Sequence, residues 1–165
     1  MSDTLRARLE AGDVALGVLD NTYSPAVVEL CGELGVDFVW LDLEHGGPSP
    51  WDAQTVEGFA RAAERSGTEL LVRVPTADPA LVRKVLDTGV RNVFLSRVES
   101  ATEVQRAVRA SRFAIEGAPG ERGLASPRAR RWGQREGYVD REDREAMVGV
   151  TIENRAAVAD LEAIL

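Results

Sequence analysis

Short apolar runs alternate along the chain with longer, helix-like segments. The short runs predict β-strands at residues 14–19, 36–43, 69–74, 92–98 and 147–153. The longer segments predict helices at residues 4–11, 24–33, 50–66, 78–87, 100–109 and 154–165. Ser24, Asp78, Ser100 and Asn154 are typical N-terminal caps for four of these helices.

The segment from 113 to 146 interrupts this alternation. It is rich in Gly, Arg and Pro and predicts a long loop with one short helical piece near 140–146. A loop of this length inside a compact domain indicates either a functional role or a missed element.

Strands that alternate with helices predict a parallel sheet with right-handed crossovers, in a single α/β domain spanning residues 1–165. Such a sheet either closes into a TIM barrel or stays open and doubly wound. A TIM barrel needs eight strand–helix units in about 250 residues. This chain has 165 residues and five predicted units, so length alone favours the open sheet.

Composition excludes several classes of protein. With 27 acidic and 20 basic residues the net charge is −7, which argues against a nucleic-acid binder. We expect no membrane span, because no apolar stretch approaches about 20 residues, and no signal peptide. The single Cys31 cannot form an internal disulfide and suggests the cytoplasm. Only Lys84 is available for Schiff-base chemistry.

Polar side chains gather where the predicted strands end, which is where α/β folds place functional groups. Alternation along the strands sets Arg73 and Glu153 on the face opposite the helices. Ion pairing among Asp42, Glu44 and Arg73 is the alternative explanation. Because several such groups occur together with the only histidine, we favour a site. The residues in question are Asp42, Glu44, His45, Arg73, Thr151 and Glu153.

Three further features are open to two interpretations. The glycine-rich segment 117–123 lacks a nucleotide-binding pattern, and its Arg122 either approaches an anion or lies in a solvated turn. Asp87 either favours a turn or orients His45. The arginines that follow, Arg128, Arg130, Arg131 and Arg135, are either a nucleic-acid contact or a solvated face with salt-bridge partners, and the negative net charge favours the second interpretation.

The motifs in their order resemble the HpcH/HpaI family of class II, metal-dependent pyruvate aldolases, from about residue 5 to residue 165. They are FVWLDLEHG at 38–46, LVRVP at 71–75, LDTG at 86–89, VESA at 98–101, PGERG at 119–123 and IE at 152–153. The resemblance reverses the preference for an open sheet. It implies a TIM (β/α)8-type barrel of which about the first five β/α units are present.

The resemblance also implies a function. A divalent metal, Mg²⁺ or Mn²⁺ with Co²⁺ as a further candidate, supports cleavage of 4-hydroxy-2-oxo acids to pyruvate and an aldehyde. Glu153 would be the metal ligand, with Asp42 and Glu44 nearby through water. Arg73 would bind the oxo acid and stabilise its enolate, and Arg122 and Thr151 would contact substrate. His45 paired with Asp87 would transfer the proton.

The sequence departs from the family in several places. Thr151, Ser96 and Leu19 replace the glutamine, proline and tryptophan of many members, and the aspartate strand that carries the second metal carboxylate is absent before Leu165. Unpaired sheet edges predict a homo-oligomer. Two alternatives stay open: a weakly active or inactive fragment that acts as an assembly module, and a related acyl-CoA lyase.

Overall fold

The computed structural model describes residues 4–115, 120–125 and 127–165. It contains one parallel sheet in the order β1-β2-β3-β4-β5. A doubly wound sheet reverses its strand order at a switch point, whereas a barrel adds each strand beside the one before it. The predicted barrel-type fold with five units is therefore confirmed. The strands are β1 (Gly17–Asp20), β2 (Phe38–Asp42), β3 (Glu69–Val74), β4 (Asn92–Leu95) and β5 (Met147–Val150).

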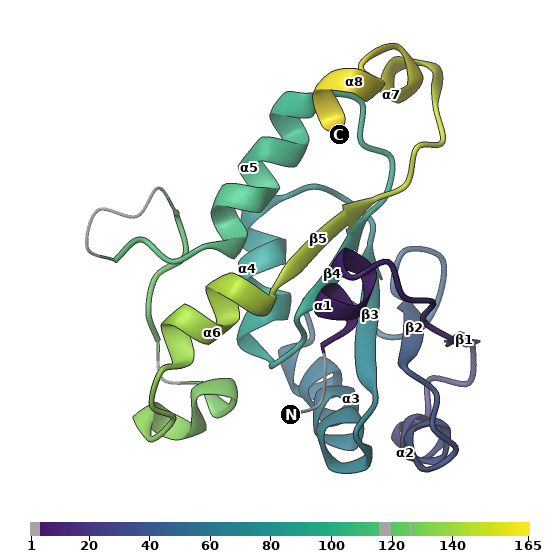
Figure 1. Cartoon of the computed structure of the whole chain (residues 1–165), viewed down its shortest axis with the longest axis vertical. Coiled ribbons are helices and arrows are strands. Elements are labelled where there is room, and N and C mark those ends of the chain that lie inside the picture. Colours follow the sequence, from purple (N-terminus) through teal and green to yellow (C-terminus); the bar gives the residue numbers. More distant parts are fainter. Residues whose placement is uncertain (1–3, 116–119, 126) are drawn as a thin grey trace.

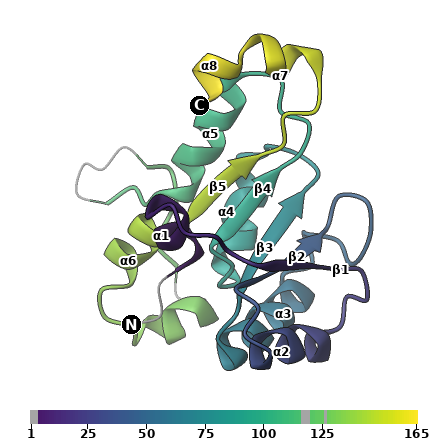
Figure 2. The same cartoon turned by 45° about the vertical axis from the view of Figure 1, so that its right-hand side comes forward.

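The crossover helices lie on one side of this sheet (Figures 1 and 2). They bury the apolar face of the strands in the main core, where Val39, Val72 and Val93 are fully buried and Val148 and Val150 pack at the margin. The predicted assignment of strand faces is confirmed at these positions. The helices are α1 (Leu5–Glu10), α2 (Pro25–Glu33), α3 (Ala53–Ser66), α4 (Pro79–Asp87), α5 (Ala101–Ser111), α6 (Tyr138–Glu145), α7 (Arg155–Ala159) and α8 (Leu161–Ile164).

Several predicted elements differ from the structure at their ends, and two of these differences follow from specific hydrogen bonds. The strand expected at 14–19 starts only at Gly17, because the backbone N–H of Leu16 donates to the Asp37 carboxylate instead of entering the ladder. The helix expected at 154–165 divides at Asp160, where the backbone leaves the helical region and the carboxylate accepts a hydrogen bond from Ala101 N at 2.7 Å. A tertiary contact thus overrides the local helical pattern.

The segment after α5 contains more structure than expected. A 3₁₀ segment, η1 (Arg128–Gly133), precedes α6, and a second apolar cluster forms from Phe113, Ala129 and Tyr138. These elements pack beside the amino-terminal end of the sheet, where Arg91 of the α4–β4 turn pairs with Glu142 of α6. In the described part of the chain, no helix combines the length and apolarity that crossing a membrane demands.

Candidate active site

The carboxyl ends of β2, β3 and β5 bring most of the predicted site residues to one edge of the sheet. Asp42 is the last residue of β2 and is the register partner of Arg73 on β3. Glu44 and His45 follow in the β2–α3 loop, and Thr151 and Glu153 follow β5. Parallel strands all end at the same edge, so residues more than 100 positions apart in the chain share this region.

Arg73 and Asp42 form a two-point ion pair at the centre of this edge. Arg73 Nε donates to Asp42 Oδ1 at 2.9 Å, and Nη2 donates to Oδ2 at 2.5 Å. The two side chains are 18% and 13% exposed, and Glu44 Oε2 lies 3.4 Å from Arg73 Nε. The ion-pair arrangement considered from sequence is therefore present, and it holds the guanidinium in one orientation.

Charge and hydrogen bonding keep Asp42 ionised. The hydrogen bond from Arg73 lowers its pKa; burial opposes this, and the backbone N–H groups of Glu44 and His45 reinforce it. The same hydrogen bond raises the pKa of Arg73, whereas burial lowers it and the charges of Asp42, Glu44 and Glu153 raise it further. Asp42 is consequently a poor proton acceptor, and its role is to fix Arg73.

The inner face of the sheet beneath Arg73 is aromatic. Its guanidinium carbon lies 6.0 Å from the centroid of the Trp40 ring, and Trp40 in turn packs 5.3 Å from Phe94. Gly149 of β5 leaves space for this ring, because a Cβ at that position would lie 2.2 Å from Phe94 Cε2. A charged group above an apolar floor is screened little by water, so its interaction with a bound anion is strengthened.

Glu153 lies on the same side of the sheet as Arg73. Its Oε1 accepts a hydrogen bond from Arg97 N at 2.7 Å and lies 3.2 Å from the Thr151 hydroxyl. Arg97 adopts φ = 57°, in the left-handed region, which turns its N–H toward this carboxylate. No described residue donates to the second oxygen, Oε2, so the exposed Glu153 side chain retains an oxygen for a ligand.

His45 is highly accessible to solvent. Its side chain is 69% exposed and its Nε2 lies 3.4 Å from Glu44 Oε2. The loop that carries it packs under Tyr23, whose hydroxyl donates to Asp42 O at 3.1 Å. A Cβ on Gly47 would approach the Tyr23 ring to 2.4 Å, so this close approach requires glycine there.

Tyr23 and Arg97 were missed by the analysis of the sequence. Tyr23 follows β1 and Arg97 follows β4, so each lies at a strand end where functional groups were expected. Their position after a strand was the signal in the sequence that could have identified them. Their contacts to Asp42 and Glu153 depend on left-handed backbone at Tyr23 and Arg97, with φ of 51° and 57°. No local sequence pattern predicts this conformation at these residues.

Within one chain, the structure does not bring Asp87 or Arg122 to this edge. A single chain therefore does not form the predicted pairing of His45 with Asp87 or the predicted substrate contact of Arg122, and both stay predictions. Asp87 ends α4, so it lies near the amino-terminal end of β4, opposite from His45. Arg122 is 1% exposed; its Nη2 donates to Asp87 Oδ1 at 2.9 Å and its guanidinium lies 4.5 Å from the Phe113 ring centroid. Of the glycine-rich segment, residues 117–119 lie outside the described residues.

Comparison with known proteins adds to this geometry. The family model for HpcH/HpaI aldolase/citrate lyase matches residues 17–165. The chain belongs to the HpcH/HpaI aldolase/citrate lyase family. It is therefore assigned to a family of lyases, and the resemblance noted in its motifs is confirmed.

Among the family's members, the chain is 35% identical to a hydroxypyruvate/pyruvate aldolase of Paraburkholderia phytofirmans over 99% of its length and 63% of that protein's. It is 34% identical to a 4-hydroxy-2-oxovalerate aldolase of Novosphingobium aromaticivorans, with 98% and 60% covered. A solved HpcH/HpaI family protein from Burkholderia cenocepacia superposes with a TM-score of 0.85 at 32% identity and covers 98% of this chain and 64% of its own. The chain thus spans about three-fifths of the length of these relatives.

Proposed function

We propose that this chain carries the oxo-acid-binding part of a divalent-metal-dependent aldolase, which cleaves or forms 4-hydroxy-2-oxo acids through a pyruvate enolate. The observation that supports this most directly is the placement of the two groups: Arg73 on β3 and Glu153 after β5 lie at the carboxyl end of the same sheet, on the face opposite the helices. A guanidinium and a carboxylate with a free oxygen are the two groups that such chemistry requires. The aldolases among the relatives support the same reaction class.

The donor set in the described residues fits a hard cation that keeps water and substrate as ligands. Within those residues, no three His, Cys, Asp or Glu side chains are arranged to hold a metal together. Mg²⁺ is commonly bound by one or two carboxylates, with waters and substrate oxygens completing the shell. Glu153 would supply a carboxylate, with Asp42 and Glu44 reached through water. The bound metal would provide Lewis-acid stabilisation of the enolate.

Arg73 is suited to the substrate's carboxylate. Asp42 occupies its Nε and one Nη2 hydrogen, and no described residue accepts from Nη1, so the guanidinium can donate on its outer side. The fixed orientation means that little rearrangement accompanies binding. Thr151 beside Glu153 would contact the same ligand. His45 would exchange the proton of the C4 hydroxyl, since an imidazole can both accept and donate a proton and this ring is open to solvent.

Pyruvate enolisation tests the proposal without knowledge of the aldehyde. The exchange of pyruvate methyl protons for deuterium is followed by NMR with this chain and Mn²⁺ or Mg²⁺. We expect exchange that depends on metal and falls at least about 100-fold in Glu153→Gln and in Arg73→Met. Asp140→Asn, on the exposed face of α6, is the matched control and keeps the wild-type rate.

Equal exchange in wild type and Glu153→Gln would refute the role of this carboxylate. A folded chain that neither binds Mn²⁺ in the presence of pyruvate nor exchanges protons would favour the assembly-module alternative. If exchange occurs but Arg73→Met leaves the KM for pyruvate unchanged, the proposed contact of Arg73 with the substrate carboxylate is wrong.

We also infer self-association and a reducing location. β1 pairs only with β2 among the described strands, and Val18 and Leu19 on it are exposed, which favours pairing with another copy. Light scattering behind size exclusion tests this, and a monomer at 0.1 mM would contradict it. Cys31 is free and buried in the core, as in cytoplasmic proteins.

A further inference from the structure

A second cation-rich region lies at the opposite end of the sheet from the candidate active site. A groove of about 550 Å³ runs between the carboxyl-terminal half of α3 and η1. Four of its seven lining residues are arginines, and Glu64 is its only acidic residue. The lining residues are Arg61, Glu64, Arg65, Arg128, Arg131, Trp132 and Gln134. We call this the arginine groove.

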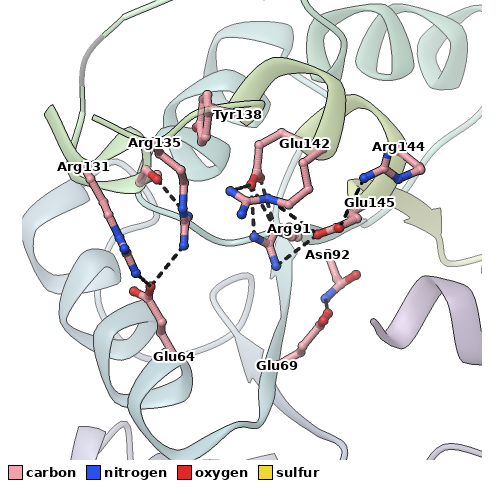
Figure 3. Close-up of polar contacts among 12 residues, drawn as sticks. Glu64, Glu69, Arg91, Asn92, Arg131, Arg135, Tyr138, Glu142, Arg144 and Glu145 are labelled. Atoms are coloured by element: carbon pink, nitrogen blue, oxygen red, sulfur yellow. Dashed lines mark hydrogen bonds and ion pairs between the residues drawn. The ribbon is translucent and has the colours of Figure 1, made fainter. Parts of the chain in front are cut away.

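The arginine groove carries more positive charge than its one acidic residue, Glu64, can neutralise. The single Glu64 carboxylate accepts from Arg128. It also accepts from Arg135 Nη2 at 3.3 Å and lies 3.8 Å from Arg131 Nη2 (Figure 3). Arg65 is exposed and has no ion-pair partner among the described residues. Two arginines of the groove, Arg128 and Arg131, therefore share one carboxylate with the neighbouring Arg135. Of the other two lining arginines, Arg61 pairs with Glu57 outside the groove and Arg65 is unmatched in the described part of the chain.

The neighbouring cluster has more carboxylates for the same number of arginines. There Arg91, Arg141 and Arg144 share two carboxylates, Glu142 and Glu145, whereas three arginines share Glu64 alone. At Glu64, burial would raise the pKa, but the hydrogen bond from Arg128 and the surrounding arginine charges lower it overall. In a chain of net charge −7, so concentrated an excess of guanidinium groups indicates an anionic ligand.

Trp132 adds a flat apolar surface to the same groove. Its side chain is 70% exposed, although tryptophan usually buries most of its ring. Arg131 and Trp132 both adopt left-handed backbone, with φ of 50° and 51°. Bulky residues rarely take this conformation.

We propose that the arginine groove binds a nucleoside diphosphate, with its phosphates on Arg65, Arg128 and Arg131 and its base stacked on Trp132. Guanidinium groups match phosphate oxygens in charge and geometry. An exposed indole is a stacking surface for a base. The volume of the groove lies within the range of small-molecule sites. This site is separate from the proposed aldolase chemistry and does not depend on it.

Titration of the full chain with ADP in buffer containing EDTA tests the proposal, because chelation removes any contribution of a metal site. We expect saturable binding by calorimetry that weakens as salt is raised from 50 to 300 mM. Pyrophosphate and adenosine serve as the two partial probes. Each lacks one of the two proposed contacts and should bind at least about five-fold more weakly than ADP.

Variants locate the binding. Arg65→Ala and Arg131→Ala should each weaken ADP about five-fold or more, whereas Arg106→Ala, an exposed arginine on α5, should not change it. Trp132→Asn tolerates the left-handed backbone and should reduce ADP affinity to that of pyrophosphate, while Trp132→Phe should retain it. Glu64→Gln should strengthen binding, because it removes the carboxylate that competes for the arginines.

Three outcomes overturn the proposal. The first is no ADP binding at millimolar concentration and low salt. The second is ADP binding that Arg106→Ala weakens as much as Arg65→Ala does, which would mean diffuse attraction over the surface. The third is equal affinity for ADP and pyrophosphate with no effect of Trp132→Asn, which would leave an anion site without a base platform.

Discussion

Removing the guanidinium of Arg73 tests how charge is held at the sheet edge. In Arg73→Met the apolar stem is kept, but Asp42 and Glu44 lose the cation that lies against both. Breaking a buried ion pair costs about 3–5 kcal/mol of unfolding free energy. Asp42 keeps the hydrogen bonds from Glu44 N and His45 N, and the side chains of Asp42 and Arg73 are slightly exposed in the wild type. We therefore expect a loss of about 3 kcal/mol in unfolding free energy at pH 7.

The converse change should cost less. In Asp42→Asn, Arg73 retains Glu44 at 3.4 Å and is open to solvent on its outer side, so we expect about 1–2 kcal/mol. Urea unfolding followed by tryptophan fluorescence measures both. With a slope of about 2 kcal/mol per M, the midpoint should fall by about 1.5 M for Arg73→Met.

The effect should also depend on pH, and its sign follows from Asp42. In the wild type the pKa of Asp42 is lowered, so its contribution to stability is complete at neutral pH and is lost as pH falls below the ordinary carboxyl range. Arg73→Met lacks that contribution at every pH, so the difference between the two proteins should shrink from pH 7 to pH 3.5. A loss below about 1 kcal/mol at pH 7, or one that is equal at both pH values, would refute this account.

Three further predictions concern the scaffold and are measured by the same unfolding experiment. Phe59→Ala empties the fully buried centre of α3 and should cost about 3–5 kcal/mol, with Phe59→Leu well below that; similar losses would contradict tight packing there. Asn154→Ala removes both the cap of α7 and a 2.8 Å hydrogen bond to Val98 O, and should cost about 1–2 kcal/mol; no change would show that neither contact contributes. Asp87→Asn leaves the buried Arg122 with a neutral partner and should cost about 2–3 kcal/mol of unfolding free energy. If the loss comes from the unpaired charge, the double variant Asp87→Asn with Arg122→Met should recover part of that stability.

Local sequence signals were sufficient to predict the bounds of several helices and strands. The helix from Pro25 to Glu33, the strand from Glu69 to Val74 and the helix from Pro79 to Asp87 have the bounds that their caps, prolines and glycines predict. Strand alternation also placed Arg73 opposite the helices. These features depend on residues close together in the chain, so their physical causes can be read from the sequence.

Contacts between residues far apart in the chain could not be predicted from such local signals. Asp160 interrupts the last helix because it binds the start of α5, and η1 is held by Arg128 and Arg135 meeting Glu64 of α3. His45 and Asp87 do not meet within one chain for a topological reason, since α4 carries Asp87 away from the edge where β2 ends. The carboxyl end of a strand and the carboxyl end of the helix that follows it lie at opposite ends of a parallel sheet.

The sequence by itself determined the alternation of strands and helices, the face on which each strand is buried and the family to which the chain belongs. Only the tertiary structure decided which charges meet: Arg73 with Asp42 at one end of the sheet, Arg122 with Asp87 and three arginines with Glu64 at the other. The reason is that periodicity is a property of neighbouring residues, whereas an ion pair depends on the distance between atoms that only the packed chain brings together.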